Sequence, residues 1–182
     1  MTLITNNCLG GYIYQMFNMP YTSPFVWGRI LIDDMCLIAE DLESINFDKF
    51  EIYEMNSTRT KNVPGAYTIK LENGAEIHFT HYKDKQYTIE RFKERSKRID
   101  YSNIVFTVMS THIALDTMES YKHLYDIATR KNYGILILNT NPDMNMPFAS
   151  DYSGMVNYSD IKCPKKLAKR VIPEFTEKFM KI

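Results

Sequence analysis

The sequence predicts an α/β fold in which helices cover both faces of a parallel or mixed central sheet, giving three layers, α/β/α. Two apolar runs at residues 104–109 and 133–138 support this prediction, because an unbroken apolar run is typical of a strand buried on both faces. Helical patterns separate such runs along the chain, as in sheets that are covered by helices. A plain α+β sandwich is the alternative architecture.

Strand and helix patterns alternate in the first third of the chain. The predicted elements are a strand at 2–6, a helix at 11–18, an irregular stretch at 19–30, a helix that ends at about 42 and a short strand at 50–53. Asp33 or Asp34 is expected to cap the second helix, because a carboxylate can accept a hydrogen bond from the first free N–H groups.

A hairpin is predicted next, because Asn73-Gly74 separates two alternating runs. The later elements are strands at 67–71 and 76–82, a charged helix at 84–99, a helix at 116–131, a loop at 140–162 and a final helical segment from Pro164. Asp116 and Glu119 have the spacing of a capping box for the helix that ends near Lys131. Pro173 is expected either to kink the final helix or to start a new one.

Size and composition favour a single domain that spans residues 1–182. Twenty-two basic residues balance 22 acidic ones, so the overall charge gives no support for binding nucleic acid. The polar start of the chain and the absence of about 18 consecutive apolar residues argue against a signal peptide and a transmembrane segment. Three widely spaced cysteines without a CxxC pair predict neither a disulfide framework nor a metal site. A cytoplasmic protein is expected.

Polar residues follow four of the predicted strands. These groups are Asn6-Asn7-Cys8, His81-Tyr82, Ser110-Thr111-His112 and Asn139-Thr140-Asn141. If the strands run parallel, all four groups lie at one edge of the sheet, where α/β proteins bind ligands. The alternative is that these residues are polar only because loops lie at the surface.

Cys8 is the candidate nucleophile. It lies where a strand passes into a helix, and the positive end of a helix favours the thiolate. His81 or His112 is the candidate base. The alternative is a Cys8 that only packs beneath the sheet edge. His78 and His81 are disfavoured as a metal pair, because strand residues three apart point to opposite faces.

Several further residues are candidate ligand contacts. Gly10 and Gly11 are expected to allow close backbone approach or to form a nest for an oxyanion or phosphate. Arg95 and Arg98 lie in an arginine stripe on the predicted helix 84–99, and Arg95, nearest the apolar boundary, is expected to reach inward. The segment from Met19 to Phe25 is either a wall over the Cys8 loop or a rigid crossover. No dinucleotide-binding, P-loop or Gly-x-Ser-x-Gly pattern occurs.

These residues resemble an uncharacterised bacterial family called domain of unknown function 1919, whose members are often labelled exopolysaccharide biosynthesis proteins. The matching motifs are Ile4-Thr5-Asn6-Asn7-Cys8-Leu9-Gly10-Gly11, Tyr14, Pro20-Tyr21-x-Ser23-Pro24, His78-Phe79-Thr80-His81-Tyr82, Phe92-x-x-Arg95-x-x-Arg98-Ile99 and the strand from Asn103 to Met109. The resemblance implies a three-layer α/β/α fold and a role in making or decorating surface polysaccharide. It names no cofactor.

Three functions remain open. The first is an acyl- or glycosyl-type transferase that acts on a small-molecule donor or a glycan, with Cys8 and His81 as catalytic residues. Its expected ligand contacts are Asn6, Asn7, Gly10, Gly11, Tyr14, Ser23, Arg95 and Arg98. The second is a non-catalytic module that binds a glycan or nucleotide sugar through tyrosine rings such as Tyr21. The third is a hydrolase that uses the same Cys–His pair.

Overall fold

A computed structural model describes residues 1–54, 66–82, 84–110, 117–140, 146–151 and 164–180. Its main sheet, sheet A, is parallel throughout and has the strand order β1-β5-β6-β7. The strands are β1 (Thr2–Thr5), β5 (Ile104–Met109), β6 (Gly134–Asn139) and β7 (Ser150–Asp151). The two apolar runs of the sequence therefore form adjacent central strands, as predicted.

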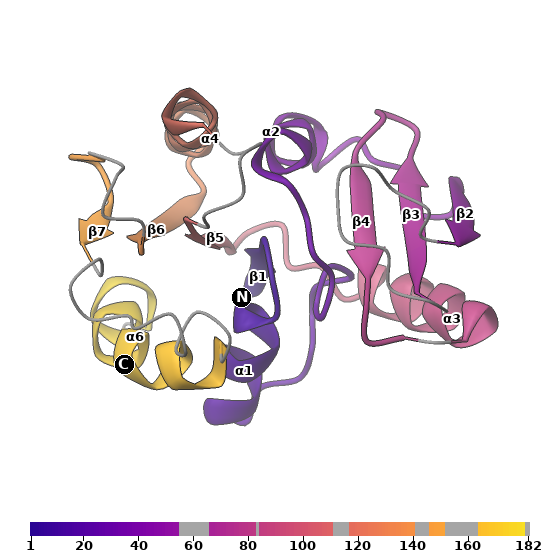
Figure 1. Ribbon diagram of the computed structural model, residues 1–182, viewed down its shortest axis with the longest axis horizontal. Helices are drawn as coiled ribbons and strands as arrows, with labels where there is room; N and C mark the ends of the chain where they lie inside the picture. Colours follow the sequence, from indigo (N-terminus) through magenta and orange to yellow (C-terminus); the bar gives the residue numbers. More distant parts are fainter. Residues whose placement is uncertain (55–65, 83, 111–116, 141–145, 152–163, 181–182) are drawn as a thin grey trace.

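Helices cover both faces of sheet A (Figure 1). On one face lie α1 (Leu9–Met16) and α6 (Pro164–Phe179), which contact each other. On the other face lie α2 (Ile32–Asp41) and α4 (Met118–Arg130), which also contact each other. The α/β class is confirmed, and the arrangement around sheet A has the predicted three layers.

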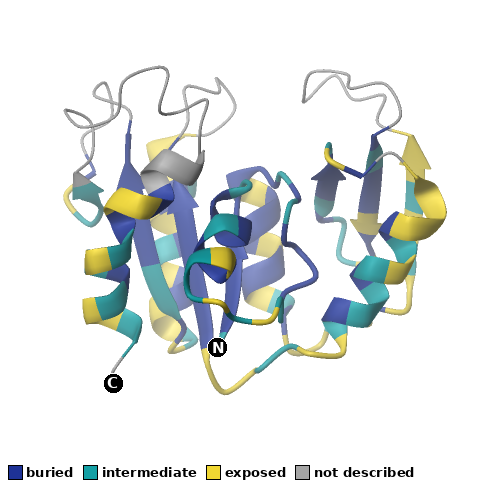
Figure 2. Cartoon of the chain, turned by 90° about the horizontal axis from the view of Figure 1, so that it is seen from below, coloured by how far each residue is buried: buried dark blue, intermediate teal, exposed yellow. Residues whose placement is uncertain are grey.

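Alternation along the strands explains why both faces are covered. Leu3 and Val105 pack with α1 and α6 in one apolar cluster, whereas Ile4 and Phe106 pack with α2 and α4 in the other. Every residue of β5 is buried, and Figure 2 shows the strands of sheet A as a largely buried layer between helices with exposed outer sides.

A second, antiparallel sheet, sheet B, lies beside this unit with the strand order β2-β3-β4 (Figure 1). Its strands are β2 (Phe50–Glu54), β3 (Tyr67–Leu71) and β4 (Glu76–Phe79), and α3 (Lys85–Ser96) follows them. The hairpin between β3 and β4 turns at Asn73-Gly74, with Gly74 at φ 91°, which confirms the predicted turn.

The two sheets share one hydrophobic core. The cluster that contains Ile4 and Phe106 of sheet A also contains Ile77 and Phe79 of sheet B and Phe92 of α3. Backbone hydrogen bonds add to this contact, because the N–H of His78 donates to the carbonyl oxygen of Arg29 and the reverse bond also forms, both at 2.8 Å. The far edge of β4 is therefore held against the crossover that follows α1.

Several predicted boundaries differ from the structure. The strand predicted at 76–82 ends at Phe79, because its partner Tyr67 is the first residue of β3. Asp33 and Asp34 do not cap α2 but lie in its first turn, and Leu31 is the N-cap residue. The N-cap of α4 is Thr117, whose side chain accepts a hydrogen bond from Ser120 N, while Asp116 lies outside the described residues. The final helix α6 continues through Pro173, so no new helix starts there.

Among the residues that the structure describes, no helix is long and apolar enough to cross a membrane.

Candidate functional site

The loop that follows β1 lies at a topological switch point of sheet A. Strands β1 and β5 are neighbours, but α1 follows β1 on one face and α4, the next described helix after β5, lies on the opposite face (Figure 1). Chain segments that diverge in this way leave a crevice at the carboxyl ends of the two strands, which is where open α/β sheets bind ligands. Residues 6–8 leave β1 at this position, and Ser110 leaves β5 beside them.

Cys8 and His81 meet at this edge. Cys8 Sγ lies 2.9 Å from His81 Nε2. His81 follows β4 and therefore comes from sheet B rather than from the same sheet as Cys8. The expectation that four polar groups share one parallel edge holds for the described members of three groups, namely Asn6-Asn7-Cys8 after β1, Ser110 after β5, and Asn139 and Thr140 at the end of β6. The group after β4 belongs to the antiparallel sheet B, and its His81 contacts Cys8. His112, the other candidate base, lies outside the described residues.

The local environment keeps the Cys8 thiol protonated. Burial raises the pKa of Cys8 to about 11, and a backbone hydrogen bond opposes that rise only in part. The expected lowering of this pKa at the helix N-terminus is therefore wrong, because desolvation outweighs it. In the resting protein a neutral thiol faces the His81 ring, which is exposed to solvent. For the thiol to donate its proton, Nε2 must be the unprotonated nitrogen of the imidazole.

Asn6 and Asn7 hold the loop in place through their side chains. The Asn6 amide extends the pairing of β1 with β5, since its Nδ2 donates to Met109 O at 2.8 Å and its Oδ1 accepts from Met109 N at 3.1 Å. Asn7 Oδ1 accepts from Leu9 N at 2.8 Å, so α1 begins at Leu9 rather than at the predicted residue 11. Both amides thus make structural contacts that fix Cys8 between them and α1.

The two glycines after Cys8 allow close packing. A Cβ atom added to Gly10 would lie 2.6 Å from Thr5 Oγ1, and one added to Gly11 would lie 2.6 Å from Cε2 of Trp27. The Gly10 N–H, which the predicted nest would offer to a ligand, donates to Thr5 Oγ1 at 3.3 Å. The glycines therefore bring α1 against β1 and against Trp27, and their direct contact with a ligand remains a prediction.

Trp27 is a site residue that the sequence reasoning missed. Its backbone has φ 69°, a left-handed conformation that is rare for a bulky side chain and that occurs most often at functional sites. Its ring packs edge to face with Tyr12 at 5.1 Å, with His81 at 6.0 Å and with Tyr21 at 6.4 Å between centroids. We call these four residues the aromatic cluster. The only available sequence signal was that Trp27 is the single tryptophan of the chain.

Comparison with known proteins identifies the family of this chain. The family described as domain of unknown function (DUF1919) matches residues 1–146, a range that holds Cys8, His81 and the aromatic cluster. The chain belongs to the DUF1919 family. An uncharacterized protein of Haemophilus influenzae is 27% identical over 104 residues, which make up 57% of this chain and 47% of that protein. The DUF1919 chain thus spans about half the length of this relative.

Two other candidate ligand contacts of the DUF1919 chain, Tyr14 and Ser23, are buried. The Tyr14 hydroxyl accepts from Leu3 N at 2.8 Å and lies 2.8 Å from Thr22 Oγ1. Ser23 Oγ accepts from Phe25 N at 3.3 Å. Both hydroxyls thus make hydrogen bonds within the protein. Tyr14 holds the edge of β1, and Ser23 holds the crossover after α1.

The two candidate arginines of α3 have different environments. Arg95 is 7% exposed, and its Nη1 donates to Tyr82 Oη at 2.6 Å and to Val26 O at 3.3 Å. Arg98 is exposed and forms an ion pair with Glu94. The predicted inward direction of Arg95 is confirmed, and Arg98 lies on the solvated side of the helix.

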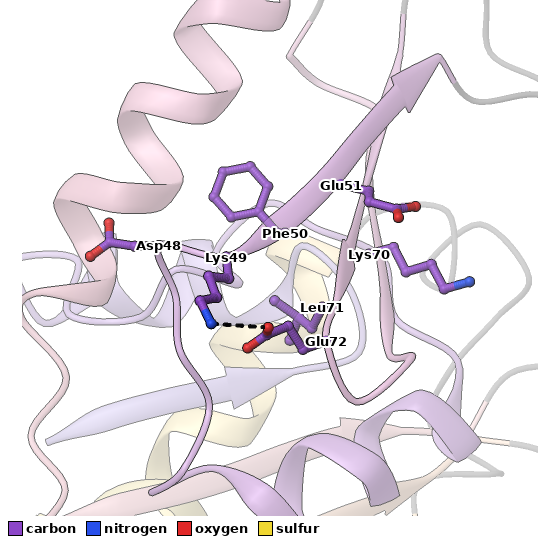
Figure 3. A pocket seen from close by; sticks show the side chains of 7 residues that line it. All are labelled: Asp48, Lys49, Phe50, Glu51, Lys70, Leu71 and Glu72. Atoms are coloured by element: carbon purple, nitrogen blue, oxygen red, sulfur yellow. Dashed lines mark ion pairs between the residues drawn. The ribbon is translucent and has the colours of Figure 1, made fainter.

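A cavity lined only by described residues lies on sheet B rather than at Cys8. It has a volume of about 440 Å³, and Figure 3 shows its lining side chains, with Lys49 paired to Glu72. They are Asp48, Lys49, Phe50, Glu51, Lys70, Leu71 and Glu72. Acidic and basic side chains face one another there, and no residue of the Cys8 site contributes. We therefore base the functional argument on the Cys8–His81 pair.

Proposed function

We propose that this DUF1919 protein is an enzyme that transfers an acyl group through Cys8, with His81 as its general base. The observation that carries the proposal is the distance of 2.9 Å between Cys8 Sγ and His81 Nε2. A thiol with a base in hydrogen-bond reach is the arrangement that activates a cysteine nucleophile. The position of the pair at the switch point of sheet A supports the proposal further.

The raised pKa of Cys8 favours one form of this chemistry. A thiol with a pKa of about 11 is almost fully protonated at neutral pH, so the base must remove its proton as the bond to substrate forms. His81 Nε2 takes that proton while Cys8 Sγ attacks the carbonyl carbon of an acyl donor. The bond from carbon to the leaving group then breaks, and the leaving group receives the proton from His81.

The second half of the reaction releases the enzyme. A hydroxyl group of the acceptor attacks the thioester carbon while His81 takes the hydroxyl proton. The carbon–sulfur bond then breaks, the ester product leaves, and the proton passes from His81 to the Cys8 sulfur. We propose a glycan hydroxyl as this acceptor, because the family resemblance implies the making or decorating of surface polysaccharide. With water as acceptor the same residues would give a hydrolase, and analysis of the products separates the two. Acyl transfer suits a thiol better than glycosyl transfer, because thiol–imidazole pairs form thioesters.

The pair is tested by alkylation of the native protein with iodoacetamide, followed for each cysteine by mass spectrometry. Cys8 is expected to react at neutral pH and to slow by about tenfold or more in His81→Ala, since general bases contribute at least that much. His123→Ala, which removes another exposed imidazole, is the matched control and should leave the rate unchanged. Cys36, which is buried and has a pKa raised to about 12, is the internal reference.

Acyl transfer itself is tested with p-nitrophenyl acetate. The wild type is expected to gain one acetyl group on Cys8, and Cys8→Ala and His81→Ala should not gain it. The proposal would be refuted if Cys8 were alkylated and acetylated at the same rate in the wild type and in His81→Ala.

A second candidate function is a glycan-binding module without catalysis. The aromatic cluster favours it, because Tyr12, Tyr21 and Trp27 are only half-buried and such rings stack on sugars. In that case neutral oligosaccharides should change Trp27 fluorescence equally in wild type and Cys8→Ala, and Cys8 should not be acetylated.

A further inference from the structure

Arg95 is a buried cation that has no anionic partner among the residues that the structure describes. Its side chain makes no ion pair with any residue that the structure describes, although Glu94 is its neighbour in α3. Glu94 pairs instead with Arg91 and Arg98 on the solvated side of the helix. Because a charge is costly to remove from water, buried charges in proteins are normally paired. The missing partner of Arg95 therefore needs an explanation.

Two aromatic rings lie against the guanidinium group, and only one of its three nitrogen atoms donates hydrogen bonds to described residues. Arg95 Cζ lies 4.9 Å from the ring centroid of Tyr21 and 5.8 Å from that of Tyr82. Both hydrogen bonds of the side chain come from Nη1. Nε and Nη2 donate no hydrogen bond to a described residue, and the residue keeps 7% of its surface exposed.

The unused edge has the geometry of an oxyanion receptor. Nε and Nη2 of arginine donate two parallel hydrogen bonds, which match two oxygens of a carboxylate or phosphate group. The two ring contacts and the two hydrogen bonds of Nη1 hold the guanidinium group in place, so little freedom remains to be lost when an anion binds. Arg98 lacks this arrangement because Glu94 already occupies it.

Arg95 is also connected to the segments that carry the candidate catalytic site. Its acceptors Val26 and Tyr82 are the chain neighbours of Trp27 and His81. Tyr21, whose ring lies against the guanidinium group, packs edge to face with Trp27. An anion on Arg95 would therefore lie beside Tyr21 of the aromatic cluster, and His81 of the Cys8–His81 pair belongs to the same cluster.

We propose that Arg95 binds an oxyanion, the carboxylate or phosphate of a substrate, and anchors that substrate next to Cys8. That the anion belongs to a substrate rests on the proposed function, whereas the anion site itself does not. An anchor remote from the reacting bond orients the substrate and so lowers the barrier at the reacting centre. Of the two arginines that the sequence predicts as ligand contacts, Arg95 is thus the one assigned to the anion.

Trp27 is the single tryptophan and lies beside this site, so its fluorescence reports on binding in the wild-type protein. The protein is titrated with sodium phosphate and, separately, with sodium acetate, at an ionic strength held constant with sodium chloride. A saturable change with either anion is expected. Phosphate alone points to a phosphorylated substrate, acetate alone to a carboxylate, and both to an oxyanion site in general.

Two variants show whether Arg95 is the receptor. Arg95→Lys keeps the charge but loses the paired donors, and its dissociation constant should rise by about tenfold or more. Arg98→Lys is the matched control from the same helix and should bind like the wild type. The proposal is overturned if neither anion gives a saturable change, or if Arg95→Lys binds as tightly as Arg98→Lys.

Chemical modification of the wild type covers the case in which Arg95→Lys does not fold. Phenylglyoxal modifies arginines, and the saturating anion should protect Arg95 but not Arg98, as read by mass spectrometry. Equal modification of Arg95 with and without anion would also refute the site. Alkylation of Cys8 needs no anion, so failure of the Cys8–His81 pair and failure of the Arg95 site are measured independently.

Discussion

The Tyr14 hydroxyl is predicted to stabilise the free protein, and Tyr14→Phe tests this. Tyr14 is fully buried, and its hydroxyl accepts from the backbone N–H of Leu3 at 2.8 Å. Thr22 Oγ1 donates its own proton to Met1 O, so the Tyr14 hydroxyl donates to Thr22 Oγ1, at 2.8 Å. Strand β1 is the edge strand of sheet A, and Tyr14 thus satisfies a backbone donor that has no neighbouring strand.

The expected loss follows from this geometry. Removal of the hydroxyl leaves the buried Leu3 N–H without its acceptor, and such a loss costs about 1–3 kcal/mol. For a chain of this size each kcal/mol lowers the melting temperature by about 2–4 °C, so a decrease of roughly 2–12 °C is expected. Burial also raises the pKa of Tyr14, which keeps its hydroxyl protonated across the neutral range.

Urea unfolding followed by Trp27 fluorescence and by circular dichroism measures this effect. The denaturant dependence should keep its slope and move its midpoint, because the variant changes stability and not the surface exposed on unfolding. Tyr12→Phe is the matched control, since its hydroxyl bonds to no described residue and its ring is half-buried, and it should stay within about 0.5 kcal/mol of the wild type. If Tyr14→Phe were as stable as Tyr12→Phe, the structural role of the Tyr14 hydroxyl would be refuted. The ligand contact that the sequence predicts would then be the remaining role for Tyr14.

Two further predictions concern the residues around Cys8. Gly11→Ala places a methyl group 2.6 Å from the Trp27 ring and should therefore shift the fluorescence of Trp27. The free energy of unfolding should fall by about 0–2 kcal/mol, because overpacking offsets the gain in helix propensity. An unchanged fluorescence spectrum would contradict the close packing of α1 on Trp27. The free energy of unfolding should fall between about pH 8.5 and 11, because a thiol with a raised folded pKa stabilises the protein fully below its unfolded pKa and loses that contribution as pH rises through the folded value. Cys8→Ala should reduce this fall while Cys36 contributes equally to both proteins, and identical pH profiles would show that Cys8 is not desolvated.

Local patterns in the sequence predicted most elements of the fold. The apolar run at 104–109 coincides with β5, because a strand buried on both faces needs apolar residues at nearly every position. Asn73-Gly74 correctly predicted the hairpin between β3 and β4, because only a few residue types adopt the backbone angles that this turn requires. Helix starts were less predictable, because several neighbouring polar residues could accept a hydrogen bond from the first free N–H groups of a helix. At α1 this acceptor is Asn7, and at α4 it is Thr117.

Contacts between distant segments could not be derived from local patterns. Sequence reasoning named His81 or His112 as the base and favoured His81, but it could not show that the packing of sheet B beside β1 brings His81 to Cys8. Helical spacing did predict that Arg95 points inward, because the position relative to the apolar face is a local property. The missing anionic partner of Arg95 depends on where Glu94 points, which the sequence does not determine.

The origin of Cys8 and His81 in different sheets has a mechanical consequence. Cys8 is fixed to sheet A through Asn6 and α1, and His81 is fixed to sheet B as the continuation of β4. The contact between Cys8 and His81 therefore depends on the junction between the two sheets. This junction includes the backbone pairing of Arg29 with His78, the shared apolar core and the hydrogen bonds of Arg95 to Val26 and Tyr82. Since only Arg95 among these has an edge open to a ligand, an anion that binds there would act directly on the junction that holds the thiol and the imidazole together.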